Sequence, residues 1–240
     1  MAINFFGSRD GTGVGFADSV QIDKPMPPSF YDELYFTGKK SNWSLPYTQQ
    51  NFGVFFKNVA KFVVEGFPLA RSILDVGCAR GFLLDGLFEV ARINKFQVDL
   101  EGFDASEFAV ENAVPQVKSM IKQATLSTFQ FTRSYDLILA LDVFEHCSES
   151  DLRDFLTKAR PFVNDSIFAQ IPQPHSPQVY DEPSHITIKP REWWNELFTD
   201  CGWQLTPEAK SQTELAMQDP LPRSIPWDVF IFRSGNNAFG

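Results

Sequence analysis

The segment Ser72–Phe82, with the sequence SILDVGCARGF, carries the residues whose types and spacing most clearly indicate chemistry. A short apolar run leads to Asp75, and a turn from Gly77 to Gly81 is followed by apolar residues at helical spacing. Glycines let backbone N–H groups approach a ligand, and the first turn of a helix favours anionic or electron-rich groups. This succession of strand, glycine turn and helix predicts a site for a nucleotide-type ligand.

Two further acidic residues follow predicted strands: Asp104 comes after residues 96–103, and Asp142 comes after residues 135–141. In open α/β sheets, ligands bind beyond the carboxyl ends of the strands, and an acid after the second strand accepts the hydroxyl groups of a ribose. The alternative interpretation of either residue is a turn residue or a helix cap. The glycine turn that precedes Asp104 favours the ribose-binding interpretation.

The spacing of the residues in this turn distinguishes between the known classes of nucleotide-binding site. Aligned on Gly77, the dinucleotide pattern GxGxxG places Ala79 at its second glycine and Phe82 at its third, where helix and strand must pack closely. A phenylalanine fits that position badly, which argues against a nicotinamide-dependent enzyme. Because no lysine follows the turn, the phosphate loop of nucleoside triphosphatases is excluded.

The turn Asp75–Gly81, DVGCARG, resembles the DxGxGxG turn of class I S-adenosylmethionine-dependent methyltransferases, with Ala79 in place of the middle glycine. Residues 101–106 are similar to the ribose motif GxDxS of that family, and residues 135–146 to its segment FDLIxxxDVLEH. Residues 184–203 are similar to its THVTxFT region. The matches span about 72–204 and resemble most the small-molecule branch, methyltransferase types 11, 12 and 23.

The resemblance implies S-adenosyl-L-methionine as the cofactor, with the glycine turn under its methionine moiety and Asp104 at its ribose. The family often has an acidic residue near the adenine after the third strand, where this chain has Gln123, Thr125 or backbone groups instead. The cofactor contacts that the resemblance predicts are Asp75, Gly77, Cys78, Ala79, Gly81, Asp104, Ala105, Gln123, Leu141 and Asp142.

Methyl transfer to oxygen or nitrogen requires a positioned acceptor and, for some acceptors, a base. All three histidines follow predicted strands on the ligand side, and His185 and His146 are the candidate bases, although each also fits a purely structural role. The acceptor is expected to contact Tyr31, Tyr35, Trp43, His175 and Tyr180, for which core packing is the alternative. No metal is expected, because no His, Cys or Asp spacing suggests one.

These side chains must be positioned by strands that alternate with helices through the middle of the chain. Apolar runs predict strands at 72–76, 96–103, 119–124, 135–141, 166–171, 203–210 and 228–233, and apolar periodicity predicts helices at 48–65, 81–92, 107–114, 149–160 and 191–200. The expected fold is α/β and Rossmann-like. It has a mostly parallel seven-stranded sheet, helices on both faces and an antiparallel C-terminal edge strand.

The glycine- and proline-rich residues 1–28 predict a flexible N-terminal arm, because the GTGVG run follows no strand and is followed by prolines. Residues 29–240 are expected to form one methyltransferase domain. Within it, the aromatic and helical residues 29–66 predict a lid, and residues 172–190 predict an irregular insert.

The amino-acid composition limits which binding partners and which cellular compartment are expected for this chain. The net charge of −9 and the pI near 4.8 argue against nucleic acid and anionic membranes as partners. Three widely spaced cysteines, and the lack of a secretory pattern or an apolar span, favour a reduced cytoplasmic setting. The oligomeric state stays open.

The predicted function is therefore transfer of a methyl group from S-adenosylmethionine to an oxygen or nitrogen atom of a small molecule. The alternative is a catalytically silent protein of the same fold that binds S-adenosylmethionine or S-adenosylhomocysteine and acts through a partner. The absence of an acid in the adenine region motivates this alternative.

Overall fold

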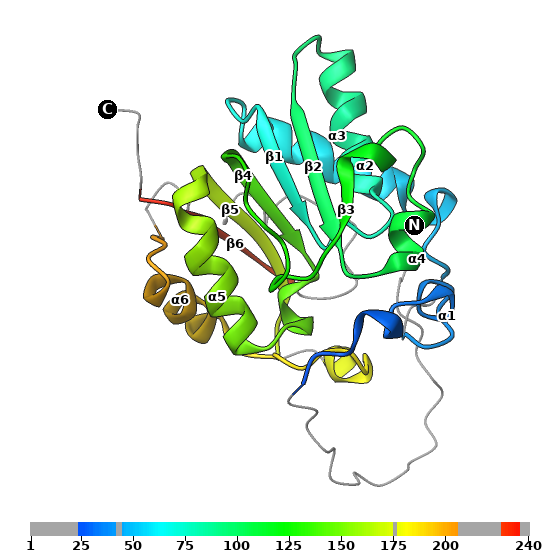
Figure 1. The fold of residues 1–240 in the computed structure, drawn as a ribbon, viewed down its shortest axis with the longest axis vertical. Helices are drawn as coiled ribbons and strands as arrows, with labels where there is room; N and C mark the ends of the chain where they lie inside the picture. The colour runs from blue at the N-terminus through cyan, green and yellow to red at the C-terminus, as the bar shows by residue number, and fades with distance from the viewer. Residues whose placement is uncertain (1–23, 42–44, 175–176, 206–226, 236–240) are drawn as a thin grey trace, which may run out of the picture.

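The computed structural model describes residues 24–41, 45–174, 177–205 and 227–235. Within these residues a six-stranded sheet has the order β3-β2-β1-β4-β5-β6 (Figure 1). Its strands are β1 Ser72–Val76, β2 Asp99–Asp104, β3 Ile121–Gln123, β4 Tyr135–Leu141, β5 Val163–Pro172 and β6 Trp227–Arg233. The first five pair in parallel, and β6 runs antiparallel to β5. The α/β class, the parallel sheet and the antiparallel edge are thereby confirmed.

The predicted number of seven strands is wrong for the described residues, which form six. A separate strand was expected at 203–210. Of its described residues, 203–205, only Gln204 pairs with the sheet, as an isolated antiparallel bridge to Arg233. Gln204 N donates to Arg233 O at 3.0 Å, and Arg233 N donates to Gln204 O at 2.9 Å. Residues 206–210 lie outside the described part of the chain.

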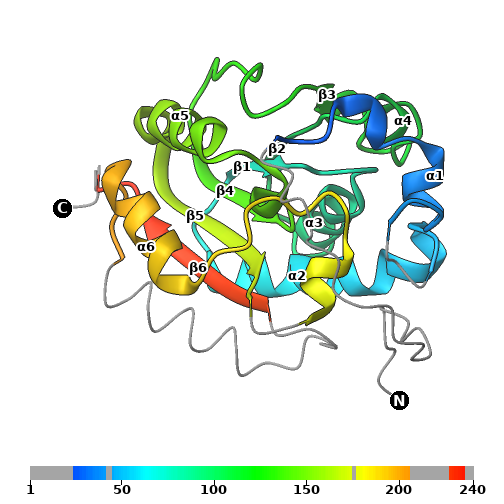
Figure 2. The same cartoon turned by 90° about the horizontal axis from the view of Figure 1, so that it is seen from below.

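Both faces of the sheet are buried, which explains the nearly continuous apolar sequence of β4. Leu137 and Leu139 pack on one side, with the apolar faces of α2 (Gln49–Gly66) and α3 (Phe82–Ile93). Ile138 and Ala140 pack on the other, with α5 (Glu149–Ala159) and α6 (Arg191–Asp200). Figure 2 shows these two helical layers on opposite sides of the strands.

The helices begin close to the positions that their capping residues predict. Ser106 Oγ accepts Ala109 N at 2.9 Å at the start of α4 (Glu107–Glu111), and Ser148 Oγ accepts Asp151 N at 3.1 Å at the start of α5. Pro190 is the N-cap residue of α6 rather than its first helical residue. The helix predicted over 107–114 is shorter and ends at Glu111.

The carboxyl ends of β1, β2 and β4 meet at one edge of the sheet, where three short helical segments lie (Figures 1 and 2). These are η1 (Pro28–Phe30), α1 (Glu33–Phe36) and η3 (Phe144–His146), while η5 (Pro177–Asp181) follows β5. Of the predicted arm, residues 1–23 lie outside the described residues. None of the helices that the structure describes is long and apolar enough to cross a bilayer.

Candidate active site

A cavity of about 550 Å³ opens beyond the carboxyl ends of β1, β2 and β4. Its floor includes the glycine turn after β1, the end of β2 and the loop after β4. Residues 24–28, α1 and the loop after β3 form further walls. This is the edge of an α/β sheet at which ligands are expected. The volume also falls in the range of small-molecule sites.

The turn after β1 depends on backbone conformations that favour glycine. Gly77 has φ +63°, and a Cβ atom there would lie 2.4 Å from Val143 Cγ2. Gly81 has φ +77° and precedes the first residue of α3. Ala79, in place of the middle glycine of the family motif, also adopts a positive φ of +47°. A left-handed alanine costs about 1–2 kcal/mol, so the surrounding contacts impose this conformation.

Asp104 lies at the end of β2 and lines the cavity. Its Oδ2 accepts Ala79 N at 2.8 Å, and its Oδ1 accepts Ser106 N at 2.8 Å. Burial raises the pKa of this carboxyl to about 6, although both N–H bonds oppose the rise. Each carboxylate oxygen retains a second lone pair for a ligand hydroxyl.

Two more carboxylates are buried at this edge of the sheet. Asp75 Oδ2 and Asp142 Oδ1 have no hydrogen-bond partner among the described residues. Burial, together with Asp104, raises the pKa of Asp75 well above its usual range, and burial raises that of Asp142 to about 8. Asp142 lines the cavity with a strained φ of +56°. This edge of the sheet is therefore suited to a positively charged group.

The other predicted cofactor residues divide into two sets. Ala105 and Leu141 line the cavity, as Gly77 and Ala79 do. Asp75, Cys78, Gly81 and Gln123 are not among the described residues that line it. The Cys78 side chain packs in the core against Gly102, where a Cβ atom would lie 2.9 Å from its sulfur. Gln123 is exposed, and Thr125, Leu126 and Ser127 line the cavity after β3 in its place.

The predicted acceptor residues are similarly divided. Tyr31 and Tyr35 line the cavity, with ring centroids 5.0 Å apart and nearly perpendicular planes. Tyr180 is 61% exposed and is not among the described lining residues. Trp43 and His175 lie outside the described residues. Within the predicted lid, α1 borders the cavity, and α2 contributes Phe56 to the cavity lining and Val59, Ala60 and Val63 to the core.

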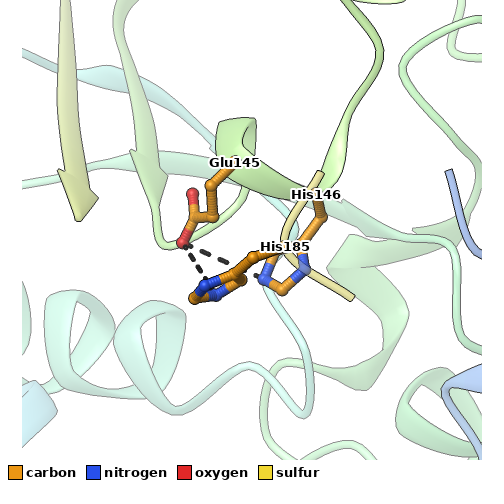
Figure 3. A group of neighbouring side chains, drawn as sticks. All are labelled: Glu145, His146 and His185. Carbon is orange, nitrogen blue, oxygen red and sulfur yellow. Dashed lines mark ion pairs between the residues drawn. The ribbon is translucent and has the colours of Figure 1, made fainter. Parts of the chain in front are cut away.

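His146 and His185 come together beside Glu145, with their ring centroids 4.8 Å apart (Figure 3). His146 also lines the cavity. Burial lowers the pKa of His185 to about 4 and that of His146 well below its usual range. Both rings are therefore neutral near pH 7, the form that can accept a proton, and their role as the base of methyl transfer stays a prediction.

Reasoning from the sequence missed several residues of the site, among them Tyr47, Val143 and Glu145. Tyr47 lines the cavity and stacks on Phe82 with ring centroids 4.8 Å apart. Val143 lines the cavity beside Gly77, and Glu145 is fully buried beside the two histidines. Tyr47 belongs to no motif, whereas Val143 is the second residue of the DVFEH segment. Glu145 belongs to the DVFEH segment, whose acidic residues could have been considered together.

The parallel sheet, the glycine turn and the acidic cavity define a Rossmann-like methyltransferase. The family described as "Methyltransferase domain" matches residues 47–208, more than half of the chain. The chain belongs to this methyltransferase family.

A curated relative is similar over a shorter stretch. The ubiquinone biosynthesis O-methyltransferase of Rickettsia felis is 37% identical over 79 residues, which cover 31% of this chain and 30% of that protein. The chain therefore matches less than a third of that relative's length.

Solved structures share the fold at low sequence identity. The magnesium protoporphyrin IX methyltransferase of Synechocystis with bound S-adenosylhomocysteine aligns with a TM-score of 0.56 at 14% identity, covering 86% of this chain and 96% of that chain. A SAM-dependent methyltransferase from Archaeoglobus fulgidus aligns with a TM-score of 0.54 at 14% identity, covering 77% and 97%. The plantazolicin methyltransferase BpumL aligns with a TM-score of 0.52 at 17% identity, covering 77% and 84%.

Proposed function

We propose that this methyltransferase transfers a methyl group from S-adenosylmethionine to an oxygen or nitrogen atom of a small-molecule acceptor. The observation that carries the proposal is one continuous cavity that joins the glycine turn and Asp104 to Tyr31, Tyr35 and His146. The cavity thus combines residues suited to binding the methyl donor with residues suited to binding the methyl acceptor. The O-methyltransferase name of the curated relative supports the same class of reaction.

The described residues fit S-adenosylmethionine. Gly77 lines the cavity without a side chain, so its backbone is accessible to a ligand, and a Cβ atom at this position would collide with Val143. Asp104 is available to ribose hydroxyls, and the loop residues Thr125 and Leu126 are placed to flank an adenine. When bound, the cofactor supplies an activated methyl group on a positively charged sulfur.

The chain's own groups would then act mainly by placement and electrostatics. The buried carboxyls of Asp75 and Asp142 favour a cationic ligand, because positive charge compensates the cost of their ionisation. Tyr31 and Tyr35 cover the acceptor side and reduce the access of water. Holding the two reactants in one cavity supplies the proximity that a displacement reaction requires.

The experiment is an assay with S-adenosylmethionine labelled on its methyl group, using phenols, catechols and primary amines as acceptors. We expect labelled product from at least one acceptor class and micromolar binding of S-adenosylhomocysteine by calorimetry. Binding of S-adenosylhomocysteine without product from any acceptor would favour the catalytically silent alternative. Absence of binding would contradict the cofactor assignment itself.

A further inference from the structure

Glu145, His146 and His185 form a cluster (Figure 3), of which His146 lines the cavity. One ligand atom from each lies within 4.8 Å of the others. His146 Nε2 and His185 Nε2 are each 3.9 Å from Glu145 Oε1. The sequence predicts no metal here because the two histidines are far apart along the chain. The fold brings them together.

Backbone hydrogen bonds hold the two parts of the cluster in place. Glu145 and His146 belong to η3 after β4, and His185 lies in the loop after η5. Glu145 O accepts both Ile186 N and Thr187 N at 2.9 Å, immediately after His185. Thr187 Oγ1 donates to Cys147 O at 2.7 Å. These bonds fix the loop against η3, so the convergence of the three side chains is built into the fold.

The hydrogen bonds of the imidazoles determine which nitrogen carries a proton. His185 Nδ1 lies 2.7 Å from Val179 O, and His146 Nδ1 lies 3.2 Å from Ser184 O. Because a carbonyl oxygen only accepts, both Nδ1 atoms must be the protonated donors. In the neutral rings, both Nε2 atoms therefore carry lone pairs, and both lie close to the Glu145 carboxylate.

Glu145 supplies the second, independent observation. The residue is fully buried, and neither carboxylate oxygen has a hydrogen-bond partner among the described residues. Its nearest titratable neighbours in the cluster present lone pairs rather than donors. The carboxyl groups of Asp142 and Glu182 also lie near it. A buried set of acceptors without a donor is costly unless a cation occupies its centre.

A proton shared between Glu145 and either imidazole would not form a good hydrogen bond, because the carboxylate oxygen lies 3.9 Å from each Nε2, beyond hydrogen-bond distance. A metal ion satisfies the cluster better, since ligand atoms about 2.1 Å from an ion lie roughly 3–4 Å from one another. Two imidazoles with Nδ1–H held by carbonyls, together with one carboxylate, are also a common ligand set for first-row divalent metals.

We infer that Glu145, His146 and His185 bind a divalent metal ion through one carboxylate oxygen and the two Nε2 atoms. His146 faces the cavity, so the open coordination positions point to the space proposed for the acceptor. This inference rests on the proposed function for its substrate class, which is an acceptor with a hydroxyl group whose oxygen binds the ion. Ion binding should draw the imidazoles slightly toward the carboxylate.

The test is a titration of the chelator-treated full chain with Mn²⁺ and, separately, Zn²⁺, followed by calorimetry and by the electron paramagnetic resonance signal of free Mn²⁺. We expect saturable binding of one ion per chain. Glu145→Gln and His185→Gln should each weaken it about tenfold or more. Glu149→Gln removes the same charge from an exposed position on α5 outside the cluster, and its affinity should equal that of the unaltered chain.

The inference is overturned if the unaltered chain shows no saturable binding of either ion up to about 1 mM, a very weak affinity. It is also overturned if Glu145→Gln and His185→Gln both bind as tightly as Glu149→Gln. S-adenosylhomocysteine titrations of the same samples keep the tests separate. If the unaltered chain binds S-adenosylhomocysteine but no metal ion, this inference is contradicted and the proposed function is not. If a variant has lost metal binding but still binds S-adenosylhomocysteine, that variant is still folded.

Discussion

The Oδ2 atom of Asp104 accepts the backbone N–H of Ala79 at 2.8 Å, which ties the end of β2 to the middle of the glycine turn. The carboxylate proposed to hold the ribose thus also stabilises the turn that approaches the rest of the cofactor. Its second oxygen accepts Ser106 N and orients the start of α4. One partly buried side chain therefore connects three segments of the proposed cofactor site.

Replacing Asp104 with asparagine should weaken S-adenosylhomocysteine binding by about tenfold or more, since charge-assisted hydrogen bonds contribute about 1.5–3 kcal/mol. The effect on the free energy of unfolding should be smaller, because two consequences of the change oppose each other. The amide has only one acceptor for the two N–H donors, which destabilises the fold, but it also avoids the burial of a charge, which stabilises it. Calorimetric titration and urea unfolding measure the two effects separately.

Glu107→Gln is the matched control for this change, because Glu107 is an exposed acid in the first turn of the neighbouring helix. It loses the same charge without touching the cavity, so its affinity should match that of the unaltered chain. An affinity of Asp104→Asn equal to that of Glu107→Gln would remove Asp104 from the ribose assignment.

Binding of S-adenosylhomocysteine should weaken as the pH falls through about 6, the raised pKa of Asp104. The ionised carboxylate is the better acceptor for ribose hydroxyls, and protonation depletes it. Well below the pKa, the dissociation constant should rise toward about tenfold per pH unit. Titrations from pH 7.5 to 5 measure this slope. In Asp104→Asn the additional slope that begins near pH 6 should be absent, whereas any slope due to Asp142, with a pKa of about 8, should remain. Persistence of the additional slope in that variant would assign it to another group.

Gly77→Ala should destabilise the fold by about 2–5 kcal/mol. Its φ of +63° costs an alanine about 1–2 kcal/mol, and the overlap of its Cβ with Val143 adds about 1–3 kcal/mol. Denaturant unfolding measures the loss. Gly66→Ala is the control, because no atom lies within 4 Å of a Cβ at that position.

The contact with Val143 can be separated from the backbone strain by adding Val143→Ala to Gly77→Ala. The double variant should be less destabilised than the sum of the single variants by about 1 kcal/mol or more, because the smaller side chain removes the overlap. Additivity within about 0.5 kcal/mol would show that backbone strain alone accounts for the Gly77→Ala effect.

Local residue types were sufficient to predict much of the scaffold. The apolar run of β4 is continuous because both faces of that strand are buried, and the prediction of residues 135–141 matches its bounds. The turn was predictable because Gly77 and Gly81 adopt positive φ values that favour glycine. Of the strand expected at 203–210, the structure describes only residues 203–205, and among them Gln204 makes a single antiparallel bridge to Arg233 of β6.

The sequence by itself determined the order of strands and helices, the glycine turn and the acids at the strand ends, because these follow from local conformational and burial preferences. Only the tertiary structure decided that Thr125 rather than Gln123 faces the cavity, and that Glu145 lies between two histidines from separate loops. Side-chain direction in a loop depends on contacts with distant segments, such as those between the Glu145 carbonyl and residues 186 and 187. Those contacts cannot be predicted from the spacing of residues along the chain.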